Sequence, residues 1–215
     1  MLEIEPNSKL LFIGDSITDC ERTRPVAEGP GRLGTGYVTM VDAHLSALYP
    51  ERRIRVVNTG VSGDTARGLK NRWQTDVLDL RPDWLSIMIG INDVWRQFDR
   101  PRQTEIHVLP EEYEAALDEV VTRTRPTLQQ LVLMTPYYIE PNRADAMRAR
   151  MDQYGAIVKK LAAKHGAILV DTQAAFDKLL ESCYPAAIAW DRVHPNQAGH
   201  TLLARAFLKA VGGEW

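Results

Sequence analysis

The sequence predicts a three-layer α/β/α fold around a five-stranded, flavodoxin-like parallel sheet with strand order 2-1-3-4-5. Two observations predict it. Short, continuous hydrophobic runs recur along the chain, as expected for strands buried on both faces of a parallel sheet. Amphipathic helical patterns lie between the runs, and this alternation implies right-handed crossovers. The 215 residues suit one such fold, so we expect a single domain over residues 1–215.

The amino-terminal half supplies two of the predicted strands, at residues 9–13 and 54–58. Residues 36–48 lie between them and carry aliphatic side chains at helical spacing. A second helix is predicted over residues 64–80, with Asp64 or Thr65 as its cap. The segment 25–36 is rich in glycine and proline, and we expect a loop there that lies over the carboxyl edge of the sheet.

The carboxy-terminal half continues the alternation. One helix should begin at Pro110, which suits a first turn, and another should stop at Gly166. The predicted strands cover residues 84–89, 130–134 and 167–170, and the predicted helices cover residues 110–124, 147–165, 173–182 and 197–211.

The composition excludes several classes of protein. Lys and Arg total 26 and Asp and Glu total 28, and this balance argues against a dedicated nucleic-acid binder. Two cysteines, Cys20 and Cys183, cannot form a disulfide framework. The acidic start of the chain does not resemble a secretory signal, and no apolar run reaches the roughly 18 residues of a membrane span. We therefore expect a cytoplasmic protein that binds neither membrane nor nucleic acid.

Polar and glycine-rich segments follow the predicted strands. In a parallel sheet the carboxyl ends of the strands meet at one edge, where ligands bind. A serine, two glycine turns, an asparagine and an Asp/His pair should therefore converge. The segments are Gly14-Asp15-Ser16-Ile17, Gly60-Val61-Ser62-Gly63-Asp64, Gly90-Ile91-Asn92-Asp93 and, before the last helix, Trp190-Asp191-Arg192-Val193-His194.

These residue types suit acyl transfer. The hydroxyl of Ser16 needs an adjacent base, and His194 can take its proton near neutral pH. Asp191, three residues earlier, can orient the imidazole and stabilise its charged form. Hydrogen-bond donors must face the developing oxyanion. The candidate donors are the backbone N–H groups of Ser16 and Gly63 and the side-chain amide of Asn92.

Each residue also has a structural alternative. Ser16 could cap a helix, Gly63 could serve a turn, and Asn92 could satisfy loop backbone groups. Asp191 could be a helix cap and His194 an ordinary surface histidine. Apart from Asp15, Asp19 and Asp93, which could themselves be caps or turn residues, nothing suggests a metal site, and we expect no cofactor.

Other functions fit the pattern less well. The segment 60–64 nearly matches the G-x-S-x-G nucleophile elbow but ends in Asp64. Asp15 as a phosphotransferase nucleophile would need a second acid where Ile17 stands. Residues 34–36 form only a fragment of a nucleotide-binding glycine motif. A non-catalytic carbohydrate-binding protein, with Ser16 as a cap, remains open.

The four segments together resemble the SGNH-hydrolase family, also called GDSL-like esterases. The resemblance covers essentially the whole chain, with Ile17 in place of the family's leucine. It implies a catalytic triad of Ser16, Asp191 and His194, with Ser16, Gly63 and Asn92 forming the oxyanion hole.

A narrower resemblance, to the intracellular acetylxylan esterases of this family, implies that the protein removes acetyl groups from xylo-oligosaccharides through an acetyl-enzyme intermediate. A general short-chain carboxylesterase or lysophospholipase-like esterase of the same fold is the catalytic alternative. The segments that carry this resemblance are residues 10–20, 87–97, 134–140, 170–176 and 189–195.

Several further side chains could contact a small acetylated saccharide or a second subunit. Aromatic rings offer faces to sugars, although ordinary packing explains each ring equally well. Trp190, next to Asp191, is the best candidate to line the site, and Trp215 would gain a partner in a homo-oligomer, which we expect. The full set of candidate substrate contacts is Asp15, Trp95, Tyr137, Tyr184 and Trp190.

Overall fold

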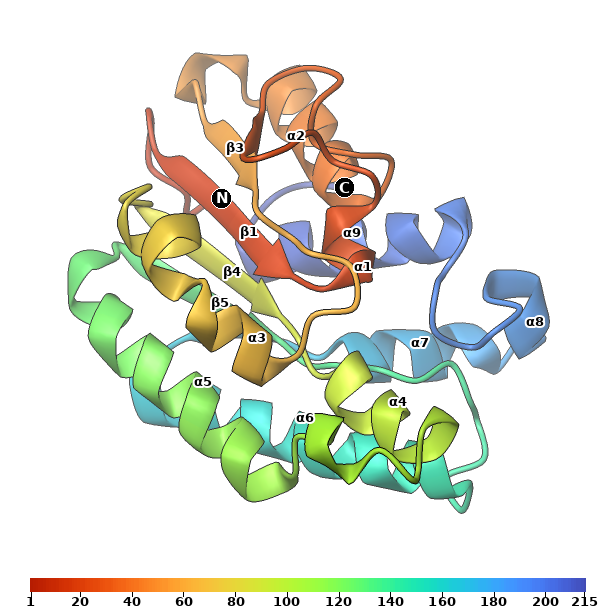
Figure 1. The fold of residues 1–215 in the computed structure, drawn as a ribbon. Helices are drawn as coiled ribbons and strands as arrows, with labels where there is room; N and C mark the ends of the chain where they lie inside the picture. The colour runs from red at the N-terminus through yellow and green to blue at the C-terminus, as the bar shows by residue number, and fades with distance from the viewer.

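A mostly parallel sheet runs through the middle of the protein, with helices on both faces (Figure 1). The structure is a computed structural model that describes residues 1–215. Six strands lie in the order β2-β3-β1-β4-β5-β6. Without β2, this is the predicted order 2-1-3-4-5, and the predicted fold class is confirmed. The five parallel strands are β1 (Lys9–Gly14), β3 (Arg55–Asn58), β4 (Trp84–Met88), β5 (Gln130–Met134) and β6 (Ile168–Val170).

The sixth strand, β2 (Ala27–Glu28), lies in the segment that was predicted to be a loop. It pairs antiparallel with β3, where Ala27 faces Asn58 and Glu28 faces Val57. Two residues give no hydrophobic pattern, so the strand exists because its neighbour has an open edge. The correction is local, since the rest of the segment has no regular secondary structure.

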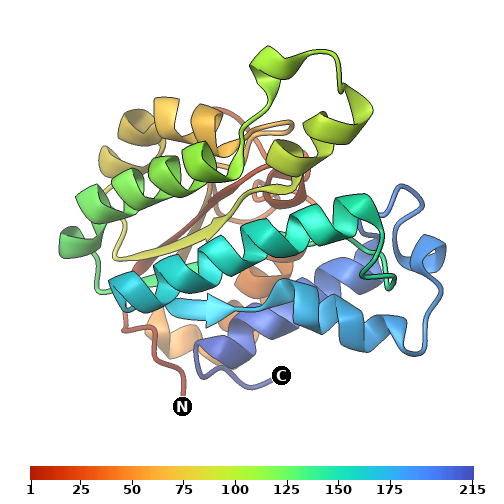
Figure 2. The ribbon, with the colours of Figure 1, turned by 90° about the horizontal axis from the view of Figure 1, so that it is seen from below.

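Two helical layers cover the sheet (Figure 2). One contains α3, α5 and α6, which pack in that order. The other contains α2, α9 and α7, with α9 between its neighbours. The long helices are α2 (Tyr37–Leu48), α5 (Pro110–Thr124), α6 (Ala146–His165), α7 (Thr172–Leu180) and α9 (Gln197–Ala210); the short ones are α1 (Ser16–Asp19), α3 (Ala66–Asn71), α4 (Ile91–Asp99) and α8 (Pro185–Ile188).

The long predicted helix over residues 64–80 is divided. Thr65 caps α3 by accepting a hydrogen bond from the Gly68 N–H, and α3 ends at Asn71. A π-helical segment, Gln74–Leu78, follows it. Trp73 and Val77 are still fully buried, because the wider turn keeps both side chains on the inner face. The short helices α1, α4 and α8 were not among the predicted elements.

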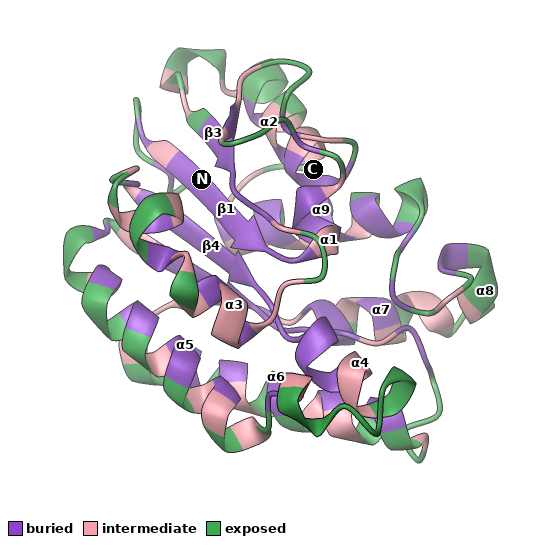
Figure 3. Ribbon diagram, viewed as in Figure 1, coloured by how far each residue is buried: buried purple, intermediate pink, exposed green.

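The core lies against both faces of the sheet, and Figure 3 shows the strands as largely buried. Residues 10–13 of β1 have no exposed surface. A cluster of 55 buried hydrophobic residues joins the strands to both helical layers. The carboxyl ends of β1, β3 and β4 therefore hold the loops that follow them on a rigid base. None of the helices combines the length and apolar character that crossing a membrane requires.

Candidate active site

Ser16 is the first residue of α1 and follows β1 directly. The buried side chain of Asp15 caps this helix by accepting a hydrogen bond from the Ile17 N–H at 3.0 Å. This turn leaves the hydroxyl of Ser16 half-exposed at the carboxyl edge of the sheet. Ser16 Oγ lies 2.9 Å from His194 Nε2. The hydroxyl is therefore within proton-transfer distance of a base.

His194 lies in the loop before α9, and Asp191 fixes its ring. His194 Nδ1 is 2.6 Å from Asp191 Oδ2. The other carboxylate oxygen accepts hydrogen bonds from the N–H groups of Val193 and His194, at 2.9 and 2.8 Å. With Nδ1 donating to Asp191, the free electron pair of Nε2 faces Ser16. Burial works to raise the pKa of Asp191, but the hydrogen bonds from His194 and Val193 outweigh it and lower the pKa.

The loop that carries Gly63 lies against the Ser16 turn. Val61 N donates to Gly14 O at 3.0 Å, and Asp19 Oδ2 accepts bonds from both the N–H and the hydroxyl of Ser62. Gly63 has φ +81°, and a Cβ added there would meet open space. The glycine is thus required by the backbone conformation, and its N–H belongs to an exposed turn beside Ser16.

Asn92 reaches the same place from the first turn of α4. Its Nδ2 donates to Asp64 O at 2.9 Å, and its Oδ1 accepts from Arg96 Nη2 at 3.2 Å. These two contacts fix which end of the amide is nitrogen. One N–H of the amide remains for another acceptor. Three candidate oxyanion donors, from Ser16, Gly63 and Asn92, therefore come from adjoining turns after β1, β3 and β4.

Two buried carboxyl groups lie beneath these turns. Burial, the largest cause, raises the pKa of Asp15 to about 7 and that of Asp93 to about 8. Asp93 Oδ1 accepts a hydrogen bond from Ala66 N at 2.9 Å, whereas its Oδ2 has no partner. At neutral pH Asp93 therefore carries a proton and adds no negative charge beside the candidate oxyanion site.

The predicted substrate contacts divide into two groups. Tyr137 and Asp15 each have 1% of their surface exposed, so neither can contact a substrate, and we do not propose them as substrate contacts. Trp95 is half-buried, and its ring meets the His194 ring edge-on with centroids 5.9 Å apart. Tyr184 and Trp190 are 76% and 85% exposed and line a surface cavity of about 560 Å³.

Two arginines that sequence reasoning missed make contacts with this site. Arg96 holds the amide of Asn92 and stacks over Trp95, 4.8 Å from the ring centroid. Its spacing of four residues from Asn92 is a signal, but only once a helix is known to begin at residue 91. Arg72 donates to Gly14 O, and no local sequence pattern indicates that contact.

The geometry weakens two of the competing interpretations. Ser62 donates its hydroxyl to Asp19 and has no histidine partner, so it is not an activated nucleophile. A Cβ at Gly34 would lie 2.4 Å from Cys20 O, so that glycine serves close backbone packing and not a phosphate. No group of three or more His, Cys, Asp or Glu side chains is arranged to hold a metal ion.

The family model of the GDSL-like lipases/acylhydrolases matches residues 12–202. The chain belongs to this family. This match confirms the resemblance to the SGNH hydrolases, or GDSL-like esterases, that the sequence motifs indicated. Among GDSL-like acylhydrolases, the chain is 58% identical over 215 residues to the acetylxylan esterase of Geobacillus stearothermophilus, covering 100% of this chain and 98% of that protein.

Two solved structures closely match the fold. The crystal structure of Axe2, an acetylxylan esterase from Geobacillus stearothermophilus, has a TM-score of 0.99 at 58% identity and covers 100% of this chain and 98% of its own. The structure of LAE5, an alpha/beta hydrolase enzyme from the metagenome of Lake Arreo, has a TM-score of 0.97 at 56% identity, covering 99% and 98%. Other matched structures are catalytic mutants of Axe2 in which a serine, a histidine or an aspartate is replaced.

Proposed function

We propose that the protein is a serine esterase that removes acetyl groups from acetylated xylo-oligosaccharides through an acetyl-enzyme intermediate. The observation that carries this proposal is the relay of Ser16, His194 and Asp191, with contacts of 2.9 and 2.6 Å. The substrate class is supported by the 58% identity to an acetylxylan esterase over the whole chain. The catalytic serine, histidine and aspartate mutants of that relative support the same triad.

Ser16 acts as the nucleophile. His194 Nε2 takes the proton from Ser16 Oγ as Oγ attacks the acetyl carbonyl carbon, and a tetrahedral oxyanion forms. When the bond to the sugar oxygen breaks, His194 returns the proton to that oxygen and the sugar leaves as an alcohol. Water, deprotonated by His194, then attacks the acetyl group on Ser16. As the bond to Ser16 Oγ breaks, His194 returns the proton to Oγ, so that acetate is released and the serine is restored. Asp191 stays ionised and stabilises the imidazolium both when the acetyl-enzyme forms and when water cleaves it.

The oxyanion is stabilised by the N–H groups of Ser16 and Gly63 and by the free N–H of the Asn92 amide. These donors are fixed before the substrate arrives, since each lies in a turn tied to its neighbours. The proposed chemistry uses no metal or cofactor. A neutral acetylated sugar also fits a chain whose net charge is only -2, because its capture needs no strong electrostatic field.

Trp95, Trp190 and Tyr184 are the proposed sugar contacts that remain. The Trp95 ring lies edge-on to the His194 ring, and the other two line a surface cavity that also includes Arg192. We also propose a cytoplasmic homo-oligomer, in which the exposed rings of Tyr184, Trp190 and Trp215 would be covered. Light scattering at working concentration tests the assembly, and a monomer would contradict it.

Acetate release from a panel of esters tests the function. The panel contains acetylated xylosides, simple alkyl acetates and acetylated amino sugars, and we expect the highest kcat/KM for the xylosides. Intact mass measurement on rapidly quenched enzyme should show one acetyl group, absent in Ser16→Ala. Ser16→Ala with near wild-type hydrolysis would contradict the serine mechanism. A preference for simple acetates would indicate a general short-chain esterase, and a preference for amino-sugar amides would overturn the substrate class alone.

A further inference from the structure

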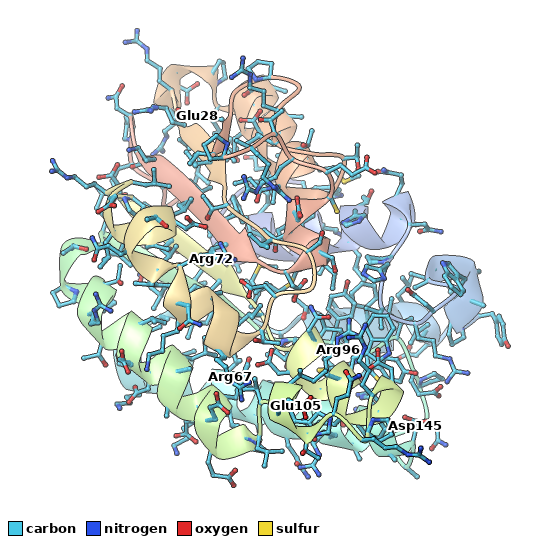
Figure 4. The ribbon with its side chains drawn as sticks, viewed as in Figure 1. Glu28, Arg67, Arg72, Arg96, Glu105 and Asp145 are labelled. Atoms are coloured by element: carbon cyan, nitrogen blue, oxygen red, sulfur yellow. The ribbon has the colours of Figure 1, made fainter.

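Arg72 is the C-cap residue of α3, and it lies between this helix and the sheet. Only 16% of its side chain is exposed. Figure 4 places Arg72 toward β1, while Arg67 of the same helix lies toward α5. Arg72 has the nearby carboxylates of Asp64 and Asp76 as partners, at 2.6 and 2.8 Å. It is therefore a largely buried cation that is paired with two carboxylates.

The same guanidinium donates to two main-chain carbonyls. Arg72 Nη1 is 2.6 Å from Thr59 O, and Nη2 is 3.1 Å from Gly14 O. Gly14 ends β1, two residues before Ser16, and Thr59 is the first residue after β3. A planar guanidinium with several fixed donors can join separate segments in one geometry, which a lysine cannot do.

Asp64, one of the two carboxylate partners of Arg72, links Arg72 to the turn after β4, which carries Asn92. Asp64 follows Gly63 directly, and its main-chain carbonyl accepts the hydrogen bond from Asn92 Nδ2. Arg72 thus contacts the segment before Ser16, the loop before Gly63 and the residue that orients Asn92. Ser16 and Gly63 each lie within two residues of an Arg72 contact, and Asn92 is hydrogen-bonded to Asp64, which Arg72 binds.

We propose that Arg72 is a positioning residue that sets the spacing of the three oxyanion donors. This inference rests on the proposed esterase function. The three turns follow different strands, so side-chain contacts across them set their spacing beyond what the sheet itself fixes. Electrostatic stabilisation of an oxyanion requires donors within hydrogen-bond distance of its final position, and a displacement of about 1 Å can lower a rate about 10²-fold. Arg72 does not touch the substrate, so its effect should appear in kcat and not in KM.

Arg67 provides a matched control on the same helix. It pairs with one carboxylate, that of Glu112, at 2.6 and 2.7 Å. It also donates to two main-chain carbonyls, those of Glu105 at 3.0 Å and His107 at 2.8 Å. These partners lie away from the three turns. Arg67→Ala therefore removes a similar set of hydrogen bonds without changing the donors beside Ser16.

The experiment compares Arg72→Ala, Arg67→Ala and Ser16→Ala on a small acetate ester. In a separate sample, reactive sites are counted with a serine-directed phosphonate, so that kcat of the unlabelled enzyme is expressed per folded, reactive site. We expect Arg72→Ala to lose about 10- to 100-fold in kcat per labelled site, with KM unchanged within about twofold. Arg67→Ala should stay within about twofold of wild type. Millimolar guanidinium, against sodium chloride at equal ionic strength, should partly restore Arg72→Ala and leave Arg67→Ala unchanged.

A kcat per site within about twofold of wild type in Arg72→Ala would overturn the inference. An equal loss in Arg67→Ala would do the same, since it would reduce the effect to general destabilisation. Arg72→Lys keeps the charge and is the second variant if the alanine variant does not fold; we expect at least a severalfold loss in kcat, and wild-type kcat would contradict the proposal. Activity in Ser16→Ala would instead overturn the function itself, so the two failures are distinguishable.

Discussion

The proposed active site has two halves that differ in how the fold holds them. The nucleophile half consists of the turns after β1, β3 and β4, where Asp15, Asn92 and Asp93 are 1%, 2% and 0% exposed. The acid–base half is the loop before α9, where the His194 side chain is 43% exposed. Three different strands support the first half, and a single surface loop supports the second.

This difference teaches which property each half needs. Oxyanion donors must be fixed before the reaction, so buried cross-links such as those of Asn92 and Arg72 suit them. In the proposed mechanism the histidine exchanges protons with Ser16, sugar and water, so it has to reach solvent. Its geometry comes from a local hydrogen-bond pattern, in which Asp191 accepts three bonds from residues two and three positions later.

The largest expected effect tests the exposed half. His194→Ala should lower kcat about 10⁴-fold, because Ser16 then lacks a base and the leaving sugar lacks an acid. Acetate release under saturating substrate measures it. His165→Ala is the matched control, since His165 also pairs with an aspartate, Asp118, at 2.7 Å but lies far from Ser16 in the fold. A loss of kcat smaller than about tenfold in His194→Ala would mean that this loop does not supply the catalytic base.

The next effect tests the buried half. Asn92→Ala should lower kcat about 10²- to 10³-fold, which is typical for the loss of one oxyanion donor. Thermal unfolding, measured beside kcat, separates this loss from a general loosening of α4. Asn71→Ala, at the exposed end of α3, is the control and should behave as wild type. Unchanged kcat in Asn92→Ala would mean that the oxyanion is held elsewhere.

The two halves should also respond to pH with opposite signs. The pKa of Asp93 is raised from 3.8 to about 8 by burial, so between about pH 4 and 8 the folded state binds more protons than the unfolded state. The contribution of Asp93 to the free energy of unfolding therefore falls as the pH rises from about 4 to 8. The pKa of Asp191 is lowered, so its contribution is present above its unfolded pKa and is lost as pH falls through the folded value.

Denaturant unfolding of wild type, Asp93→Asn and Asp191→Asn over pH 3 to 9 measures how these contributions to stability change with pH. Relative to wild type, Asp93→Asn should lose less stability on going from about pH 4 to pH 8. Asp191→Asn should lose less stability on acidification below about pH 4. Parallel curves for wild type and Asp93→Asn would mean that the buried carboxyl is not neutral in the folded protein.

The same contrast explains what the sequence could predict. Long buried strands and amphipathic helices carry strong periodic signals, so the sheet order and most helices could be predicted. The triad could be proposed because Asp191 and His194 are close in sequence and Ser16 follows a strand. Nothing local marks Arg72, whose partners Gly14 and Thr59 are 58 and 13 residues away. The exposure of Trp190 and the burial of Tyr137 likewise depend on tertiary packing, which composition does not show.

The smallest effect concerns the ion pair that anchors the exposed loop. Arg192 lies inside the Asp191–His194 turn, with φ 63°, and its Nη1 is 2.6 Å from Glu140 Oε2. The Arg192 side chain is 45% exposed, so solvent screens the pair. Exposed pairs contribute about 0–1 kcal/mol, which limits the effect of Glu140→Gln on kcat to about fivefold.

Glu140→Gln keeps the shape of the side chain, and kcat at two ionic strengths measures its effect. The loop should tolerate the loss, because Arg192 also accepts a main-chain bond from Ile139 at 2.9 Å, which the substitution leaves intact. A drop as large as that of Asn92→Ala would contradict the comparison. The exposed half would then depend on long-range contacts as strongly as the buried half does, and the hydrogen bonds within residues 191–194 would be insufficient to hold His194 beside Ser16.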